Sequence, residues 1–301
     1  MNKSFDCVVI GAGIAGCTAA IYLKRWNLNI LVLEKNMPGG TINKTSIIEN
    51  YPGIKNIDGT TLALNLYDQI QSLNINYKYG NVIKIEKQND EFQIETDLEK
   101  LKTKSIIIAT GRKPKTLNLE NEEKLIGRGI SYCATCDGPL YKDKEVYIVG
   151  GGNSALEESI YLSNICKKVT IVNRSSILKA DNYLVEKVKK ISNIDIMYNA
   201  KVQNLIEENN KLKSITINKE QESQNIDCDG LFIFIGFKPD IPNIEGINLD
   251  NGYIVVDTKM QTNIRNICAC GDIIKKDLYQ IITAAGEGAQ AANTIKNNFN
   301  K

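Results

Sequence analysis

Residues 6–35 read DCVVIGAGIAGCTAAIYLKRWNLNILVLEK, and this stretch decides the fold of the first part of the chain. A short apolar run, Cys7–Ile10, leads into a glycine-rich turn formed by Gly11, Gly13 and Gly16, and a helical pattern follows. This order is typical of a dinucleotide-binding unit. The first glycine permits the tight turn, the second lets a pyrophosphate approach the backbone, and the third allows the helix to pack closely on the strand.

Glu34 ends the next apolar run, 23 residues after Gly11. A carboxylate at this distance accepts hydrogen bonds from an adenosine ribose. The pyrophosphate then lies at the helix N-terminus, where free N–H groups and the helix dipole favour negative charge. The glycine motif alone is a weak signal, but together with its strand, helix and terminal acid it predicts a dinucleotide site.

The same pattern returns in residues 145–174, which read EVYIVGGGNSALEESIYLSNICKKVTIVNR. Val146–Val149 is the predicted strand, and the turn contains Gly150 and Gly152, with Ala155 in the third position. We therefore expect an α/β protein with two Rossmann-like dinucleotide-binding domains.

The second unit ends differently from the first. Asn173 stands 23 residues after Gly150, where the first unit has an acid, and Arg174 follows it. A neutral residue beside an arginine removes the repulsion for a 2′-phosphate, which indicates a preference for NADP over NAD. The alternative is that Arg174 lies on a solvated loop.

One of the two sites should hold FAD, because electron exchange between two dinucleotides needs one of them to be a flavin. Near the C-terminus, the apolar run Ile267–Ala269 leads to Gly271 and Asp272, and residues 278–295 form a helical pattern. Asp272 would then contact the ribityl or pyrophosphate part of the flavin. The C-terminal segment is expected to fold back onto the first unit.

This organisation predicts a discontinuous FAD-binding domain, residues 1–114 and 246–301. The inserted domain, residues 115–245, is of the pyridine-nucleotide type and is expected to carry the redox pair described next.

Cys133 and Cys136 form the only C-x-x-C in the chain. Two thiols at this spacing at a helix start can close a disulfide ring, and the helix N-terminus lowers a thiol pKa. Asp137 follows directly and is the nearest proton donor or acceptor. A reduced flavin beside this pair can pass two electrons to the disulfide. We expect no metal site, because Cys268-x-Cys270 has the wrong spacing for a zinc ribbon.

The composition supports this interpretation. The 301 residues include no histidine and eight cysteines, which excludes Ser-His-Asp or Cys-His catalysis and His-ligated metals. The other six cysteines are scattered in apolar runs and are expected to be packing residues of a cytoplasmic protein. A net charge of +2 gives no sign of a nucleic-acid partner, and no apolar run is long enough for a membrane helix.

The order of motifs resembles that of the low-molecular-weight thioredoxin reductases over essentially the whole chain. The motifs are GAGIAG, PGG with ENYPG, ATG, YCATCDG, GGGNSALEESIYLSN and CGDI. The resemblance implies a homodimer that reduces thioredoxin, with an inserted domain that rotates between two arrangements. It also implies that Cys133 and Cys136 are the redox pair and that Asp137 is the proton-transfer acid.

The resemblance further implies two sets of cofactor contacts. For FAD they are Gly11, Gly13, Gly16, Glu34, Gly40, Asn50, Gly271, Asp272 and Gln280. For NADPH they are Gly150, Gly152, Ser154, Arg174 and Lys179.

The chain departs from the family pattern at three places. Thr41 and Ile42 stand where the family usually has Gln-Leu, and Tyr279 stands where an arginine usually precedes the glutamine. The phosphate motif His-Arg-Arg-x-x-x-Arg is reduced to NRSSILK, residues 173–179, so that Ser175 replaces the second arginine. A 2′-phosphate usually takes two or three cationic partners, so a weaker NADPH site is expected.

Four hypotheses for the function follow. The first is an NADPH-dependent disulfide reductase that acts on thioredoxin. The second keeps this chemistry and takes electrons from reduced ferredoxin. The others are a small-molecule dithiol oxidase and a redox sensor, and for the sensor the sequence offers no effector surface.

Overall fold

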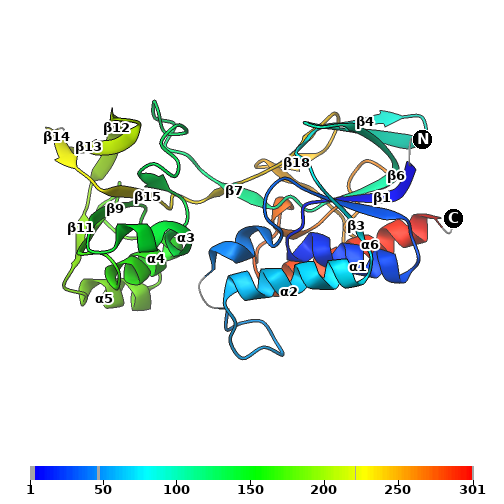
Figure 1. Cartoon of the computed structure of the whole chain (residues 1–301), viewed down its shortest axis with the longest axis horizontal. Coiled ribbons are helices and arrows are strands. Elements are labelled where there is room, and N and C mark those ends of the chain that lie inside the picture. Colours follow the sequence, from blue (N-terminus) through cyan, green and yellow to red (C-terminus); the bar gives the residue numbers. More distant parts are fainter. Residues whose placement is uncertain (1–3, 46–47, 221, 300–301) are drawn as a thin grey trace. The chain divides into compact units, whose positions relative to one another are not determined.

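The computed structural model describes residues 4–45, 48–220 and 222–299, which form two compact units (Figure 1). The first unit contains the residues up to Lys113 and those from Lys238 onward, and the second is Pro114–Phe237. The return to the first unit thus comes earlier than residue 246, where the sequence placed it. The reason is that β17 (Asn243–Ile244) already pairs with β4 (Val82–Gln88) in the sheet of the first unit.

The first unit is built on an eight-stranded mixed sheet in the order β17-β4-β5-β6-β1-β2-β3, with β20 paired to β6. Its central strands are parallel and apolar because both of their faces are buried. The remaining strands are β1 (Ser4–Ile10), β2 (Ile30–Glu34), β3 (Asn76–Tyr79), β5 (Glu91–Thr96), β6 (Lys100–Ile108) and β20 (Ile267–Ala269).

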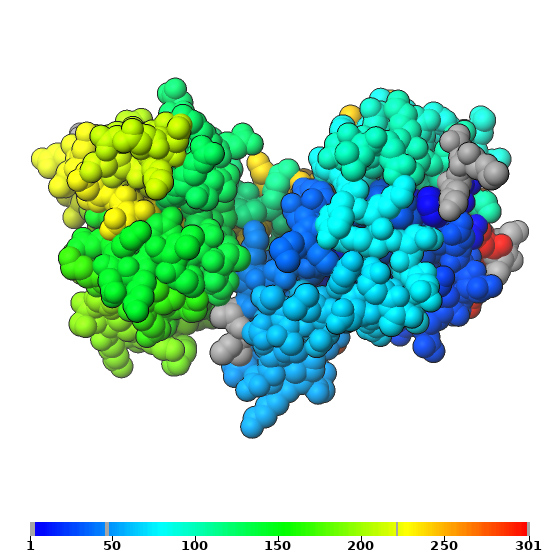
Figure 2. Space-filling model, in the orientation of Figure 1, coloured from blue at the N-terminus to red at the C-terminus, as the bar shows by residue number. Residues whose placement is uncertain are grey.

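Three helices pack on one face of this sheet, namely α1 (Ile14–Arg25), α2 (Gly59–Ser72) and α6 (Ile281–Phe299). Helix α6 lies directly against α1, and an added Cβ on Gly288 would be 2.2 Å from the carbonyl oxygen of Ala15. Figure 2 shows atoms from the two ends of the chain side by side on the surface of this unit. The prediction that the C-terminal segment folds back onto the first unit is therefore confirmed.

Shorter elements complete the first unit. The 3-10 turns η1 (Gly40–Lys44) and η3 (Gly271–Ile273) border the candidate site described below. Strands β18 (Leu249–Asp250) and β19 (Tyr253–Ile254) form a small antiparallel pair.

The second unit contains a five-stranded parallel sheet in the order β11-β10-β9-β15-β8. Its strands are β8 (Ile130–Ser131), β9 (Glu145–Val149), β10 (Lys168–Val172), β11 (Ile194–Met197) and β15 (Gly230–Ile233). Its helical elements are α3 (Ala134–Asp137), η2 (Gly138–Tyr141), α4 (Asn153–Ser163) and α5 (Asn182–Lys189). A three-stranded antiparallel sheet is formed by β12 (Ala200–Glu208), β13 (Lys211–Lys219) and β14 (Glu222–Asp227).

The two segments that connect the units pair with each other as strands β7 (Arg112–Pro114) and β16 (Phe237–Pro239). Among the described residues, no helix has the length and apolar character needed to cross a membrane.

Candidate active site

The turn after β1 has the geometry of a phosphate cradle. Gly11 has φ +102°, and an added Cβ would lie 2.4 Å from the carbonyl oxygen of Ala109. At Gly13 the only neighbour of such a Cβ would be the carbonyl oxygen of Gly39, at 3.9 Å. Gly13 is also the N-cap of α1, whose first N–H groups have no acceptor within the helix. The turn therefore leaves backbone donors and open space where a diphosphate is expected.

Glu34 lies at the carboxyl end of β2 and is 8% exposed. Its Oε2 accepts a hydrogen bond from the Ala12 N–H at 2.7 Å, and its Oε1 accepts one from the Asn36 N–H at 2.9 Å. The carboxylate thus holds the glycine turn in place, and a carboxylate has further acceptor sites for a ribose.

Segments that are distant in the sequence complete this site. The Gly39 N–H donates to the carbonyl oxygen of Ala12 at 2.8 Å, and an added Cβ on Gly40 would be 3.7 Å from the Cα of Gly13. The Asn50 amide donates to the Gln280 amide oxygen at 3.0 Å. The fold thus brings Asn50 and Gln280 together, and it also brings the Gly39–Gly40 turn next to the turn that contains Gly11 and Gly13.

The Gly271–Asp272 turn lies next to the start of α1. An added Cβ on Gly271 would be 2.9 Å from the Cβ of Ala15, which is in the first turn of that helix. The Gly271 N–H donates to Glu287 at 2.9 Å, and Asp272 forms an ion pair with Arg112 at 2.8 Å.

The prediction of a helix that begins at residue 278 was wrong, because α6 begins at Ile281. The Gln280 carbonyl oxygen accepts the first helical hydrogen bond, from Ala284, and the Gln280 N–H donates to the Thr283 hydroxyl. Tyr279 and Gln280 consequently lie in the turn that precedes the helix.

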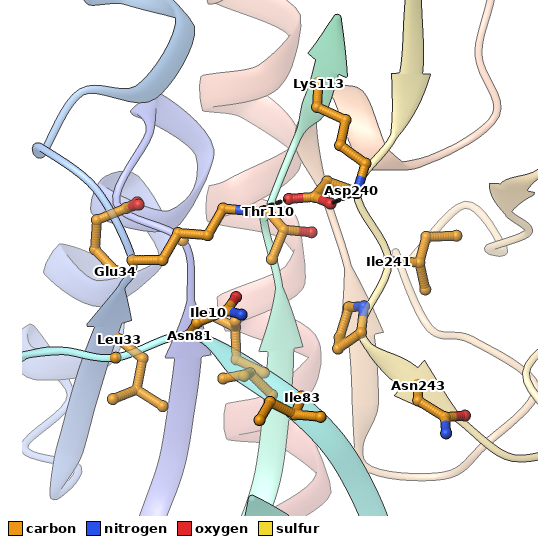
Figure 3. A pocket seen from close by; sticks show the side chains of 15 residues that line it. Ile10, Leu33, Glu34, Asn81, Ile83, Thr110, Lys113, Asp240, Ile241 and Asn243 are labelled. Carbon is orange, nitrogen blue, oxygen red and sulfur yellow. Dashed lines mark hydrogen bonds and ion pairs between the residues drawn. The ribbon is translucent and has the colours of Figure 1, made fainter. Parts of the chain in front are cut away.

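A cavity of about 300 Å³ opens at the carboxyl ends of β1, β2 and β6 (Figure 3). Ile10, Leu33 and Thr110 are among its lining residues, together with the polar Asn81 and Asn243. Ligands of open α/β sheets bind at this end of the strands, so the cavity suits the adenosine part of a dinucleotide.

Three charged residues at this cavity were missed in the sequence. Asp240 forms ion pairs with Lys35 and with Lys113, the latter at 2.6 Å, and its side chain is only 13% exposed (Figure 3). Burial raises the pKa of Asp240, but hydrogen bonds and charge from the two lysines outweigh it, so that the pKa is below its usual value. No sequence motif marks this cluster, because its members come from three separate segments.

The second unit carries the redox pair. Cys133 and Cys136 form a disulfide with a Cα–Cα distance of 5.4 Å. Cys133 is the N-cap of α3, is 7% exposed, and its Sγ accepts the Cys136 N–H at 3.2 Å. The Thr135 hydroxyl is 3.3 Å from the same sulfur, whereas Cys136 is exposed. The two sulfurs therefore differ in access and in hydrogen bonding.

Ser131 connects the redox pair to Asp137. The Ser131 hydroxyl donates to Asp137 Oδ2 at 2.6 Å and accepts the Cys133 N–H at 3.0 Å. Asp137 is itself half-buried and lies next to Cys136 in the chain. The Ser131 hydroxyl thereby links the Asp137 carboxylate to the backbone of Cys133.

The side chain of Tyr132, the residue before the redox pair, is held by Glu122. Its hydroxyl donates a hydrogen bond to Glu122, a buried carboxylate that also accepts the N–H groups of Leu117 and Leu119. Burial, followed by the Glu122 hydrogen bond and charge, raises the pKa of Tyr132 above its usual value. Sequence reasoning did not find this pair.

The glycine turn of the second unit repeats the first. Gly150 has φ +147°, and an added Cβ would lie 2.3 Å from the carbonyl oxygen of Phe234. At Gly152 an added Cβ would meet no atom within 4 Å. Gly152 is the N-cap of α4, and the exposed Ser154 lies in the first turn of that helix.

Asn173, which stands in the place of the first unit's acid, is 4% exposed and holds the loop after β10. Its Nδ2 donates to the carbonyl oxygens of Ser175 and Ile177, both at 2.8 Å. Its Oδ1 lies against Gly151, where an added Cβ would be 2.3 Å away. The side-chain amide hydrogens are therefore engaged by the loop.

The two predicted phosphate cations, Arg174 and Lys179, are exposed. The backbone N–H of Lys179 donates to the carbonyl oxygen of Gly151 at 2.6 Å, which fixes the loop against the glycine turn. Asn153 and Asp181 add two reciprocal hydrogen bonds, at 2.9 and 2.8 Å.

The remaining six cysteines are buried, which confirms that they are packing residues. Burial raises the pKa of Cys7 to about 12 and that of Cys166 to about 11, and thiols with such pKa values are unreactive at neutral pH.

The family profile described as pyridine nucleotide-disulphide oxidoreductase matches residues 5–288. The chain belongs to this family. Thioredoxin reductases of this family use FAD and NADPH, and the family's domain binds a flavin and a nicotinamide nucleotide. The glycine turn at Gly13 fits the flavin's diphosphate, because it leaves the space that a side chain would fill.

Three relatives of this oxidoreductase chain define the likeness further. A thioredoxin reductase from Mycoplasma genitalium is 43% identical over 303 residues, which cover 98% of this chain and 95% of the relative. A crystal structure of thioredoxin reductase from Lactococcus lactis has a TM-score of 0.88 at 37% identity and covers 97% and 98% of the two chains. A ferredoxin-flavin thioredoxin reductase from Clostridium acetobutylicum has a TM-score of 0.56 at 29% identity and covers 99% of both.

These findings confirm the resemblance to the low-molecular-weight thioredoxin reductases and the α/β fold with two Rossmann-like domains.

Proposed function

We propose that this oxidoreductase passes two electrons from NADPH through FAD to the Cys133–Cys136 disulfide and then to the disulfide of thioredoxin. The first unit would hold FAD, and the second would hold the nicotinamide nucleotide and the redox pair. The observation that carries the proposal is the disulfide at the start of α3, with Ser131 and Asp137 fixed beside it. The thioredoxin reductases similar to this chain support thioredoxin as the substrate.

FAD, when bound, supplies a two-electron carrier between the nicotinamide and the disulfide. In the first unit the Gly11–Gly16 turn and the α1 N-terminus would bind its diphosphate, and Glu34 its ribose. The cavity beside Asp240 would hold the adenosine, Asp272 would lie beside the diphosphate and ribityl part, and the Asn50–Gln280 pair would contact the remainder.

Reduction of the disulfide adds two electrons and two protons and gives two thiols. Cys136 is the exposed sulfur, so its thiolate attacks one sulfur of the thioredoxin disulfide and forms a mixed disulfide. The Cys133 thiolate, stabilised by the Cys136 N–H and the Thr135 hydroxyl, then attacks the Cys136 sulfur. This closes the ring again and releases reduced thioredoxin, with Asp137 exchanging the protons.

Arg174 and Lys179 support NADPH as the electron donor. Both cations are exposed beside the intact second glycine turn, and the chain places no acid where an NAD ribose would need one.

A specific observation favours a second donor, reduced ferredoxin. The Asn173 amide hydrogens are engaged by the carbonyl oxygens of its own loop, and Ser175 leaves the phosphate motif one cation short. A ferredoxin-flavin thioredoxin reductase is among the similar structures. With this donor the electrons would enter at the flavin, and the disulfide chemistry would be unchanged.

An anaerobic titration of the oxidised flavin with NADPH, NADH and reduced ferredoxin in parallel tests the donor. We expect NADPH to bleach the flavin, and thioredoxin then to be reduced. A flavin that does not respond to millimolar NADPH but is reduced by ferredoxin would reverse the order of the donors. Failure to reduce any thioredoxin would refute the proposed function. We also propose that the enzyme acts as a homodimer in the cytoplasm, which sedimentation and cell fractionation test.

A further inference from the structure

Asp272 carries a negative charge next to the place where the proposed flavin site receives a diphosphate. It follows Gly271, which packs against Ala15 in the first turn of α1. A carboxylate near a diphosphate repels it, unless a cation compensates the charge. The environment of Asp272 therefore determines whether this turn can accept FAD.

Arg112 provides the compensating charge. Its Nη2 lies 2.8 Å from Asp272 Oδ2, and the side chains of the two residues are only 21% and 24% exposed. The Arg112 guanidinium also lies over the Tyr279 ring, 4.1 Å from the centroid. Stacking on an aromatic ring fixes the plane of a guanidinium and thus its direction toward a carboxylate. Arg112 comes from β7, far in sequence from the other two residues.

The second cation near Asp272 is engaged elsewhere. Lys276 Nζ is 3.5 Å from Asp272 Oδ1 but 2.8 Å from Glu287 Oε2. Glu287 also accepts the Gly271 N–H at 2.9 Å. Lys276 therefore balances Glu287, and the closer partner of Asp272 is Arg112.

We propose that Arg112 is a positioning residue of the flavin site, which neutralises Asp272 so that this carboxylate can lie beside the FAD diphosphate. Tyr279 holds the guanidinium in place. This accounts for the tyrosine at a position where the family usually has an arginine, because the positive charge comes from β7 instead. The inference rests on the proposed function in one respect, namely that the first unit binds FAD.

The test measures FAD affinity by fluorescence titration of the deflavinated full-length protein, at about 0.02 M and about 0.5 M salt. We expect Arg112→Ala to weaken FAD binding about tenfold at low salt and less at high salt, because salt screens the charge of the partly exposed Asp272. Arg112→Lys should recover part of the loss. In the double variant Arg112→Ala/Asp272→Asn, FAD should bind more tightly than in Arg112→Ala, because the repulsion is gone.

Arg25→Ala is the matched control, since Arg25 is exposed at the opposite end of α1 and its loss changes the net charge equally. Two results would overturn the inference. One is wild-type affinity in Arg112→Ala at low salt, and the other is a loss that neither salt nor the double substitution reduces, as a purely structural role would give. If the wild-type protein itself binds no FAD, the proposed function fails instead.

Discussion

An added methyl group on Gly16 would lie 1.9 Å from the carbonyl oxygen of Gly11. The same addition at Gly13 would meet only the carbonyl oxygen of Gly39, at 3.9 Å. The glycines of one motif therefore serve different purposes. Gly16 is required for the packing of α1 on the turn, whereas Gly13 leaves space that the protein itself does not fill.

This difference predicts that two alanine substitutions affect different properties, namely stability at Gly16 and FAD binding at Gly13. Gly16→Ala should lower the free energy of unfolding by about 2 kcal/mol or more, because the backbone must move away from the new methyl group. Gly13→Ala should leave the stability of the deflavinated protein within about 0.5 kcal/mol and should weaken FAD binding, since the methyl group occupies the diphosphate space. Thermal unfolding and FAD titration measure the two effects. A Gly13→Ala protein that unfolds early but binds FAD normally would contradict this assignment.

Asp137 is expected to transfer protons at the redox pair. Asp137→Asn keeps the side-chain size and an oxygen acceptor for the Ser131 hydroxyl but cannot exchange a proton at neutral pH, so thioredoxin reduction should fall about 100-fold. Flavin content and the unfolding temperature should not change. Asp143→Asn is the control, because Asp143 is exposed in the same unit and its φ of 59° suits asparagine. Equal activities of the two variants would remove Asp137 from the mechanism.

The two sulfurs of the redox pair should differ in how they trap a substrate. In Cys133→Ser the exposed Cys136 thiol remains, and it should form a stable mixed disulfide with a thioredoxin whose single active-site cysteine is first activated as an aryl disulfide, because the aryl thiolate then leaves. In Cys136→Ser the remaining thiol is 7% exposed, and little adduct should form. Non-reducing electrophoresis compares the yields, with the double serine variant as the blank. A higher yield from Cys136→Ser would exchange the roles of the two cysteines.

Much of this architecture could be predicted from local patterns. The glycine turns, their flanking strands and the C-x-x-C are contiguous motifs, and each lies at the end of a strand as the pattern requires. Gly271–Asp272 was also placed correctly beside the first unit, because β20 has the apolar character of a central strand.

The parts that were missed depend on long-range pairing. Asp240 meets Lys35 and Lys113 only in the folded chain, and Glu122 reaches Tyr132 from a preceding turn. No sequence periodicity relates such residues, because each contact forms only when segments that are separate in the sequence pack together in the folded protein. The helix start at Ile281 was missed for a local reason, namely that Gln280 acts as a cap although its sequence continues the helical pattern.

Ser175 is the position where the phosphate motif lacks its second arginine. Its hydroxyl donates to the carbonyl oxygen of Ile177 at 3.1 Å, and its side chain is partly exposed, so a longer side chain can extend into solvent beside Arg174. Ser175→Arg should therefore tighten NADPH binding about fivefold to tenfold and leave NADH binding unchanged, because only NADPH carries the 2′-phosphate. Nucleotide titrations of the flavoprotein measure both constants. A parallel change for NADH would show that the new arginine acts elsewhere than on the 2′-phosphate.

Glu158, on α4, should make the stability of the protein depend on pH. Burial first, and then the charge of Glu157, raises the pKa of Glu158 from 4.5 to about 7, and its Oε2 is buried without a hydrogen-bond partner among the described residues. As pH rises from 4.5 to about 7, the unfolded chain loses this proton while the folded protein keeps it. Stability must therefore decrease through this window and level off above it.

Glu158→Gln removes this titration. The variant's free energy of unfolding minus that of the wild type should be about 2 kcal/mol larger at pH 8 than at pH 5. The reason is that the neutral amide resembles the protonated acid at both pH values. Urea unfolding at the two pH values measures the change, and Glu157→Gln is the control, since that neighbouring carboxylate is exposed. If both variants follow the same pH profile, Glu158 titrates at its ordinary pKa in the folded protein and the buried carboxylate must have a partner in solution.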